Sequence, residues 1–270
     1  MDYNFTADLG KGAFGEVKRA EKDGKSIAVK ILNIDSEDHK KAALKEARIL
    51  KQISTPGCHP SLACFYDYRI IGDKLYLEME YIEGETLDIF ANRYRKEGND
   101  EKLYKHLIAI IADITSGLKY MHSRGVIHRD IKPENIIIDK NHDPKLIDIG
   151  LACNTFRALC NVDGKNIPCC PGSVGTPLFS APELLIFGIS YFSTDTFSLG
   201  ATIYNSAIDQ YLYKLPERAK LSDLVHAMKY SPLPRLDTTN RFLNNLVNRM
   251  VVFEPLGRIP EDEILDLAII

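Results

Sequence analysis

The chain has 270 residues, of which 45% are hydrophobic and 26% charged, and its formal net charge is -3. This balance is typical of a globular protein with a sizeable core and excludes a chain dominated by disorder. The small negative charge gives no sign of a nucleic-acid partner or of an anionic membrane surface as partner. The length fits one large domain or two closely packed lobes.

The sequence shows no targeting or membrane-spanning segment. No stretch reaches the roughly 18 consecutive apolar residues that a membrane-spanning helix needs. The start, MDYNFTADLG, is acidic and polar, so we expect no secretory signal and a cytoplasmic protein. The six cysteines form no CxxC pair, and we expect them to be reduced thiols, with disulfides or a metal site as the alternative.

The first 80 or so residues predict a sheet with one helix. Residues 36–53 carry apolar side chains at helical spacing, and Asp35 or Ser36 can cap this helix. A turn at Asp23-Gly24 joins the first two expected strands. The expected strands are residues 9–19, 25–33, 62–68 and 74–81.

After Gly84 the pattern becomes mainly helical. Residues 103–123 predict a long helix with a broad apolar face. Two short apolar runs around a turn at 141–144 predict a hairpin, and the glycines, prolines and cysteines of 149–182 predict a loop. Further helices are expected at residues 193–207 and 241–251.

The most informative motif is HRDIKPEN, residues 128–135. It places Asp130 and Asn135 five residues apart, and Asp148 follows in the segment KLIDIG. One carboxylate that can accept a hydroxyl proton and two oxygen ligands for magnesium are the groups that phosphoryl transfer requires. With these motifs the chain resembles the eukaryotic-type protein kinase family, serine/threonine class.

The resemblance implies an α+β fold with two lobes that together form one protein kinase domain. Residues 1–83 would be a small β-rich N-lobe that binds ATP. Residues 84–270 would be a larger, mainly helical C-lobe with the catalytic loop, the activation segment and the substrate site. A cleft between the lobes would bury the nucleotide.

A glycine-rich motif precedes the expected nucleotide site. Gly10, Gly12 and Gly15 form GxGxxG, and without Cβ atoms they let backbone N–H groups approach phosphate oxygens. A glycine-rich hairpin without a ligand is the alternative. Because a strand that includes Val17, and not a helix, follows the third glycine, the pattern favours a kinase over a dinucleotide fold.

Two charged residues are expected to form an ion pair. Lys30 ends the apolar run IAVK, and the resemblance implies that it holds the α- and β-phosphates of ATP and pairs with Glu46 on the following helix. A solvated strand end and a surface carboxylate are the alternatives. The resemblance also assigns adenine-site contacts to Leu9, Val17, Ala28, Met79, Glu80, Ile82 and Ile137.

The catalytic roles also follow from the resemblance. Asp130 would be the base that accepts the substrate proton, and Lys132 would steady the γ-phosphate. Asn135 and Asp148 would bind Mg2+. The family usually has phenylalanine at position 149, and Ile149 can still fill that apolar position.

The resemblance assigns further residues to the scaffold of the site and not to its chemistry. Thr176, in the segment GTPLFSAPE, would bridge the catalytic base and Lys132, as in enzymes that act on serine or threonine. Glu183 would pair with Arg258 in a buried contact. Asp195 would hold the backbone of the HRD loop, where His128 is interpreted as a packing residue.

Regulation remains open at this point. Arg129 can receive an activation-loop phosphate in such kinases, but the position that often carries it is Gly172. Ser173 is the candidate phosphorylation site, and constitutive activity is the alternative. Four cysteines fall in the same segment, where we favour simple burial of small thiols over a redox latch or a bound metal.

The sequence therefore predicts a protein serine/threonine kinase that transfers the γ-phosphate of Mg-ATP to hydroxyls of protein substrates. A nucleotide-binding pseudokinase scaffold is the alternative, although Lys30, Asp130 and Asp148 are all present. A small-molecule kinase would lack the KPEN and GTP…APE features. Lys132 and Thr176 disfavour a tyrosine-specific enzyme.

Overall fold

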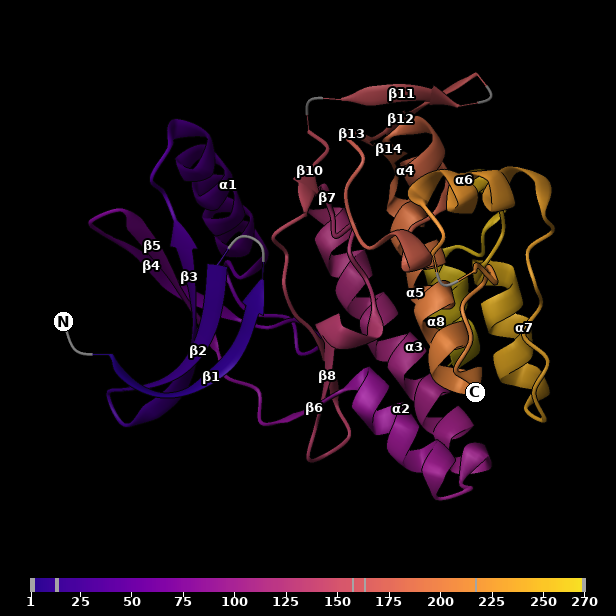
Figure 1. The fold of residues 1–270 in the computed structure, drawn as a ribbon, viewed down its shortest axis with the longest axis horizontal. Helices are drawn as coiled ribbons and strands as arrows, with labels where there is room; N and C mark the ends of the chain where they lie inside the picture. The colour runs from indigo at the N-terminus through magenta and orange to yellow at the C-terminus, as the bar shows by residue number, and fades with distance from the viewer. Residues whose placement is uncertain (1–2, 13–14, 157, 163, 217, 269–270) are drawn as a thin grey trace. The chain divides into compact units, whose positions relative to one another are not determined.

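The computed structural model describes residues 3–12, 15–156, 158–162, 164–216 and 218–268. The chain forms two compact units, Met1–Glu83 and Gly84–Ile270 (Figure 1). The first is built on a sheet and the second mainly on helices, which confirms the predicted α+β class.

The first unit contains a five-stranded antiparallel sheet. Its strands, in spatial order, are β1 (Asn4–Gly12), β2 (Gly15–Lys22), β3 (Lys25–Asn33), β5 (Lys74–Glu80) and β4 (Phe65–Ile71). The single strand predicted at 9–19 is wrong, because the chain reverses where Gly12 pairs with Gly15. The turn predicted at Asp23-Gly24 is confirmed, and both residues have the positive φ that suits a tight hairpin.

Helix α1 (Glu37–Ile53) packs beside this sheet. Ser36 caps it, since its hydroxyl accepts a hydrogen bond of 3.1 Å from the backbone N–H of His39. The buried face of α1 includes Ala43, Ala47 and Leu50 and also Glu46. A carboxylate on an otherwise apolar face indicates a buried partner, which the sheet provides.

The pleat of the sheet separates a packing face from a second face. Ala20, Ile27, Val29 and Ile31 form one apolar cluster, against which Tyr3 and Tyr76 pack. Side chains alternate along a strand, so the residues between them in β2 and β3 point the other way. That second face carries the residues that the sequence assigned to nucleotide binding.

The second unit is built around two buried helices, α3 (Asp100–Ser123) and α5 (Phe192–Ile208). The apolar face predicted for α3 is buried. Most residues of α5 are buried, which explains why this helix has little polar surface. The other helices are α2 (Leu87–Lys96), α4 (Pro182–Phe187), α6 (Leu221–Tyr230), α7 (Arg241–Met250) and α8 (Glu261–Ala268).

Short strands and turns connect these helices. Strands β6 (Gly84–Thr86), β8 (Ile136–Asp139) and β9 (Pro144–Leu146) form a small sheet that contains the predicted hairpin. Strand β7 (Val126–Ile127) pairs with β10 (Cys153–Asn154). Three 3-10 turns lie at Pro133–Asn135, Pro177–Phe179 and Pro255–Gly257.

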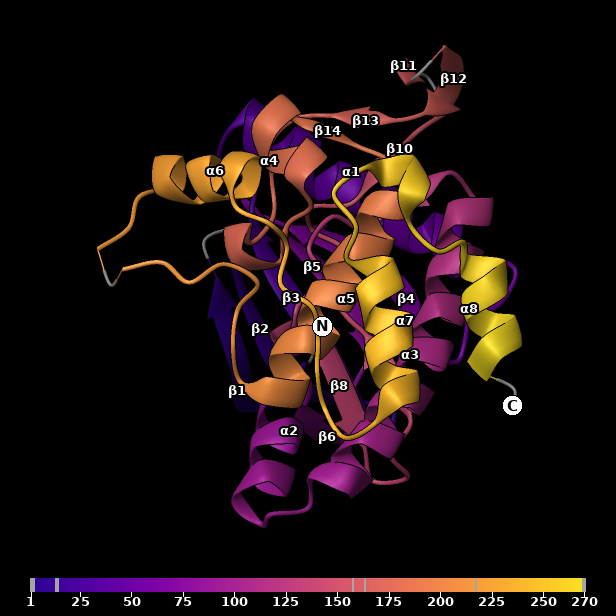
Figure 2. The same cartoon turned by 90° about the vertical axis from the view of Figure 1, so that its right-hand side faces the viewer.

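The segment predicted as a loop at 149–182 contains strands. Strand β11 (Leu159–Val162) pairs with β12 (Lys165–Pro168), and this hairpin stands away from the helices of the second unit in both Figure 1 and Figure 2. Strand β13 (Cys170–Pro171) pairs with β14 (Ile189–Ser190). The short length of these strands and their turn-forming residues hid them from the sequence pattern.

The prediction of reduced thiols is wrong, because all six cysteines are paired in disulfides. The bonds are Cys58–Cys64, Cys153–Cys170 and Cys160–Cys169. Spacing along the sequence matched no metal motif, but the fold of the segment brings together cysteines that are 9 and 17 residues apart.

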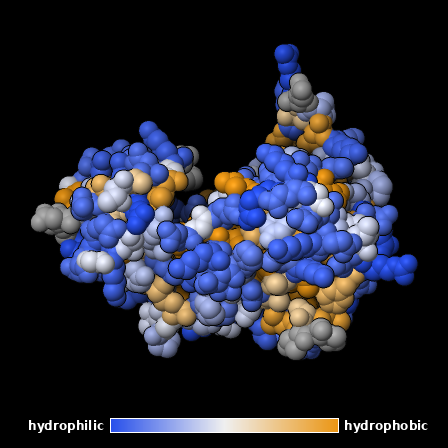
Figure 3. All heavy atoms as spheres, turned by 90° about the horizontal axis from the view of Figure 1, so that it is seen from below, coloured by the Kyte–Doolittle hydropathy of each residue, from blue (hydrophilic) through white to orange (hydrophobic). Residues whose placement is uncertain are grey.

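One face of the molecule is mostly polar. On the face shown in Figure 3, hydrophilic residues dominate both units and apolar atoms form small, separated patches. Among the helices that the structure describes, none is long and apolar enough to span a bilayer.

Candidate active site

One buried carboxylate holds the backbone of the loop at residues 128–131. Asp195, on α5, is fully buried and accepts hydrogen bonds from the backbone N–H groups of His128 (2.8 Å) and Arg129 (2.9 Å). These bonds hold Arg129 at a φ of +70°, a region that L-residues rarely occupy. The predicted role of Asp195 as the support of this loop is confirmed.

The side chain of His128 also belongs to the support of the loop. It is fully buried, its Nε2 lies 3.2 Å from the carbonyl oxygen of Ile147, and its Nδ1 accepts a bond from the backbone of Asp130. Both ring nitrogens are therefore engaged. This agrees with the interpretation of His128 as a packing residue.

A three-residue network surrounds the predicted base. The hydroxyl of Thr176 donates to Asp130 Oδ1 at 2.7 Å and accepts from Lys132 Nζ at 2.8 Å. Lys132 Nζ also lies 3.0 Å from Asp130 Oδ2. The predicted bridge is confirmed, and it joins two distant parts of the chain, because Thr176 lies 46 residues after Asp130.

The two predicted magnesium ligands are connected through the backbone. Asn135 donates from Nδ2 to the carbonyl oxygen (2.8 Å) and to Oδ2 (3.1 Å) of Asp130, so its Oδ1 is the atom suited to a cation. The backbone N–H of Ile147 donates to Asn135 O at 2.9 Å, which brings the next residue, Asp148, to the same region. An amide oxygen and a carboxylate are hard ligands that fit Mg2+.

Asp148 has a local geometry of its own. Its φ is +55°, and its Oδ1 accepts a hydrogen bond of 3.1 Å from the backbone of Gly150. Ile149, which stands where the family usually has phenylalanine, is buried and so fills the expected apolar position. Within the described ranges no cluster of three or more His, Cys, Asp or Glu side chains suits a metal, so a cation here would need ligands beyond these side chains, such as phosphate oxygens.

Sequence reasoning missed a buried histidine beneath the loop. Nε2 of His122 lies 2.8 Å from Asp195, and its Nδ1 lies 2.6 Å from Glu261 on α8. Burial lowers the pKa of His122, but the two carboxylates raise it more, to about 9. His122 is therefore charged at neutral pH and helps to hold Asp195 ionised. Its position on the inner face of α3 was the available signal.

In the first unit, the predicted ion pair is present. Lys30 Nζ lies 2.8 Å from Glu46 Oε1, and both side chains are largely shielded from solvent. Lys30 is therefore not a solvated strand end, and Glu46 is not a surface carboxylate. The pair fixes the ammonium group on one face of the sheet.

Several residues assigned to nucleotide binding share the face that carries Lys30. Val17 on β2 pairs directly with Lys30, and Ala28 lies two residues before it on β3. Met79 on β5 pairs with Ala28. Residues that pair across antiparallel strands, or lie two apart on one strand, point to the same side of a sheet. The sheet thus brings these four side chains together.

The three glycines of the GxGxxG motif differ in whether packing requires a glycine at that position. A Cβ at Gly15 would lie 2.1 Å from the carbonyl oxygen of Ile31, so glycine is required there by packing. A Cβ at Gly10 would meet no described atom within 4 Å, so packing does not explain that glycine. Gly12 forms the other side of the hairpin opposite Gly15. A phosphate that approaches the backbone would account for Gly10.

The remaining predicted adenine contacts lie on several different elements. Leu9 is exposed on β1 beside an irregularity in the strand register. The backbone N–H of Glu80 is bonded to Cys64 O at 2.8 Å, so a contact with adenine would use the Glu80 carbonyl. Ile82 lies between β5 and β6, and Ile137 lies on β8 in the second unit.

A buried ion pair supports the end of the activation segment. Both terminal nitrogens of Arg258 donate to the carboxylate of Glu183, each at 2.7 Å. Both side chains are almost fully buried. The predicted pair is confirmed, with the two-pronged geometry that suits arginine.

Comparison with known proteins agrees with this arrangement. Residues 3–268 match the protein kinase domain family. The chain is 30% identical to the "Probable serine/threonine-protein kinase nek2" of Dictyostelium discoideum, over 99% of this chain and 62% of that protein. It is 31% identical to "Serine/threonine-protein kinase D" of Synechocystis sp., over 99% of this chain and 51% of that protein.

Another relative comes from a bacterium of a different group. The chain is 29% identical to "Serine/threonine-protein kinase PknD" of Chlamydia pneumoniae, over 95% of this chain and 29% of that protein. The chain thus spans between about a third and two thirds of the length of these curated relatives.

Proposed function

Because this chain belongs to the protein kinase domain family, we propose that it is a serine/threonine kinase that transfers the γ-phosphate of Mg-ATP to protein hydroxyls. The observation that carries the proposal is the network of Asp130, Lys132 and Thr176. It places a carboxylate, a cation and a hydroxyl within hydrogen-bonding distance of one another, and the carboxylate follows directly on a backbone that the buried Asp195 holds.

The network suggests how the proton and the negative charge are handled. Asp130 would orient the substrate hydroxyl and accept its proton as the hydroxyl oxygen bonds to the γ-phosphorus and ADP leaves. Lys132 would offset the negative charge on the transferred group. Such a reaction depends on positioning and charge neutralisation more than on covalent chemistry by the protein.

The magnesium and nucleotide assignments belong to the same proposal. Asn135 Oδ1 and the Asp148 carboxylate would hold Mg2+, which supplies charge neutralisation to the phosphates when it is bound. Lys30, fixed by Glu46, would hold the α- and β-phosphates. Val17, Ala28 and the other apolar residues assigned to adenine would hold the base.

The pseudokinase alternative has no support in the described residues. A scaffold that only binds nucleotide would not need the Asp130–Thr176–Lys132 network, and the lysine–glutamate pair that such a protein often lacks is formed. The geometry thus favours the catalytic proposal.

The acceptor class can be tested directly. Purified protein is incubated with Mg-ATP and with peptides that differ only in carrying serine, threonine or tyrosine at one position, and transfer is measured by mass spectrometry. We expect transfer to serine and threonine. Transfer to tyrosine alone would contradict the proposed class, and no transfer to any peptide or to general protein substrates such as casein would favour the scaffold.

The proposal includes protein substrates and a cytoplasmic location. The kinase family supports protein substrates, and the net charge of -3 gives no sign of a nucleic-acid partner. Disulfides in a reducing compartment are usually transient and redox-sensing, so the paired cysteines are compatible with a cytoplasmic protein if they are regulatory. Fractionation of cells that contain the full-length protein would test the location.

A further inference from the structure

The Cys153–Cys170 disulfide connects two short strands of the activation segment, β10 and β13. Cys153 is on β10, which pairs with β7 so that Cys153 lies opposite Ile127, the residue just before the HRD sequence. Cys170 is on β13, which pairs with β14. The disulfide therefore joins the early part of the activation segment to a point 17 residues further along it.

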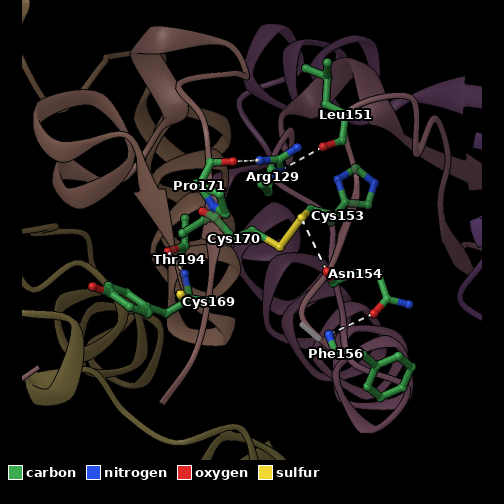
Figure 4. Close-up of a disulfide and its surroundings, with 12 residues drawn as sticks. Arg129, Leu151, Cys153, Asn154, Phe156, Cys169, Cys170, Pro171 and Thr194 are labelled. Carbon is green, nitrogen blue, oxygen red and sulfur yellow. Dashed lines mark hydrogen bonds between the residues drawn. A yellow bond between two sulfur atoms is a disulfide. The ribbon is translucent and has the colours of Figure 1, made fainter. Parts of the chain in front are cut away.

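The side chain of Arg129 bonds to the backbone just before β10 and to the backbone of β13. Its Nε donates to the carbonyl oxygen of Leu151 at 2.8 Å, and its Nη1 lies 3.3 Å from the carbonyl oxygen of Pro171. Leu151 lies two residues before Cys153, and Pro171 directly follows Cys170. Figure 4 shows the guanidinium group between the two carbonyl groups and the disulfide beside it.

Arg129 lies next to both Asp130 and the backbone before Thr176. Its backbone N–H is bonded to Asp195, and Asp130 is the next residue. Its carbonyl oxygen lies so close to Gly175 that a Cβ there would be 2.5 Å away, and Gly175 precedes Thr176. A displacement of Arg129 would therefore disturb the Asp130–Thr176 bond from both ends.

The residue nearest the guanidinium group in the activation segment, Gly172, has no side chain that could carry a phosphate to Arg129. A Cβ added at Gly172 would lie 4.0 Å from Arg129 Nη1, but the residue is glycine with a φ of +109°. The guanidinium group is buried and is bonded to backbone carbonyls instead. Burial lowers the pKa of Arg129, as expected for a cation that lacks full solvation.

We propose that the Cys153–Cys170 disulfide is a redox-controlled clamp that holds the activation segment on Arg129 and so keeps the catalytic loop in its active arrangement. This inference rests on the proposed kinase function for its effect on activity. In this role Arg129 is a positioning residue that acts through Asp130 and Thr176. Oxidation would thus anchor this segment by a covalent bond, where a phosphate would otherwise anchor it through its charge.

The chemistry of the clamp is thiol–disulfide exchange. Cys153 is partly exposed while Cys170 is fully buried, so a thiolate of a dithiol reductant attacks the Cys153 sulfur and the electron pair of the S–S bond goes to the Cys170 sulfur, which takes up a proton. The second thiol of the reductant then releases Cys153 and becomes part of a reductant disulfide. Reoxidation passes the two electrons and two protons to a small-molecule disulfide such as oxidised glutathione.

The same segment offers a matched control. The Cys160–Cys169 disulfide lies across the β11–β12 hairpin, whose strands already pair over Leu159–Val162 and Lys165–Pro168. This disulfide encloses neither Leu151 nor Pro171, whose carbonyl groups accept the bonds from Arg129. Its loss removes a disulfide from the activation segment without releasing the two strands that Arg129 joins.

The test compares Cys153→Ala/Cys170→Ala with Cys160→Ala/Cys169→Ala and with the unaltered full chain, each in oxidised glutathione and in dithiothreitol. Phosphate transfer gives kcat and the KM for ATP, and hydrogen exchange follows residues 149–176. Differential alkylation and mass spectrometry first establish which cysteines are bonded.

We expect reduction of the unaltered chain to speed exchange in this segment and to lower kcat by about tenfold or more, with the KM for ATP changed by less than about twofold. The Cys153/Cys170 variant should show both effects without reductant, and the Cys160/Cys169 variant should still respond to it. Equal exchange and kcat in the two redox states would overturn the clamp, as would free Cys153 and Cys170 thiols in oxidised protein. Faster exchange on reduction, without phosphate transfer in any state, would support the clamp and reject the kinase function.

Discussion

Arg258→Ala is expected to destabilise the second unit severely. The guanidinium group makes two bonds of 2.7 Å to Glu183 and further bonds to the carbonyl oxygens of Val252 (2.9 Å), Ser193 (2.8 Å) and Phe253 (3.1 Å). It also lies 4.9 Å from the centre of the Phe197 ring. Its removal leaves a buried carboxylate without its counter-ion and several carbonyl groups without a donor.

The size of the effect follows from that environment. Removing one partner of a buried ion pair costs about 3 to 5 kcal/mol. In a chain of this length 1 kcal/mol corresponds to about 2 to 4 °C, so the midpoint of thermal unfolding should fall by roughly 6 to 20 °C. Thermal unfolding followed by circular dichroism measures this shift.

Arg249→Ala is the matched control, because Arg249 pairs with Glu263 at the surface. An exposed pair contributes about 0 to 1 kcal/mol, so the midpoint should change by no more than about 4 °C. The double variant Glu183→Leu/Arg258→Met removes both buried charges and should be more stable than Arg258→Ala alone. If Arg258→Ala unfolds within about 2 °C of the unaltered chain, the burial argument for this pair is refuted.

Three further predictions concern Lys30, Thr176 and His122. Lys30→Met should weaken phosphate transfer by about 100-fold or more, because it removes the cation assigned to the phosphates. It should also lower the midpoint of thermal unfolding, because the shielded Glu46 carboxylate loses Lys30 as a partner, so steady-state kinetics and calorimetric nucleotide binding are measured below that midpoint. Thr176→Val should lower kcat by about tenfold or more and Thr176→Ser should restore most of it, because only the hydroxyl bonds to Asp130; unchanged kcat in the valine variant would contradict the bridge. The pKa of His122 is raised from 6.5 to about 9, so the charged imidazolium adds roughly 3 kcal/mol to the free energy of unfolding. This contribution is complete below pH 6.5 and is lost as the pH rises through about 9. Urea unfolding at pH 6 and at pH 9 should show the loss, and the loss should be smaller in Glu261→Gln.

The catalytic half of the site was predictable because its chemistry is local in sequence. Asp130, Lys132 and Asn135 lie within six residues, and each residue type has a clear chemical use. The pairs Lys30–Glu46 and Glu183–Arg258 were also predicted, although the second joins residues 75 apart. The resemblance to a family, and not periodicity, carried those long-range pairings.

The activation segment could not be predicted in the same way. Its strands β10 to β13 have two to four residues each, too few to show alternation. The disulfide partners depend on how these strands pair in space. The even number of cysteines was a signal for disulfides, but the lack of a secretory pattern favoured reduced thiols.

The buried network beneath the loop was also missed. His122 is one of several residues on the inner face of a helix that is otherwise apolar, and a histidine there usually means packing. Its two carboxylate partners come from α5 and α8, far along the chain. Only the fold shows that one aspartate links this histidine to the backbone of the catalytic loop.

The most direct test of the account measures Mg-ATP binding and phosphate transfer in the same preparation of Asp130→Asn. The account predicts that the dissociation constant for the nucleotide stays within about threefold of the unaltered chain, while the single-turnover rate falls by about 100- to 10,000-fold. Transfer at an unchanged rate, with the nucleotide still bound, would contradict the assignment of Asp130 as the base.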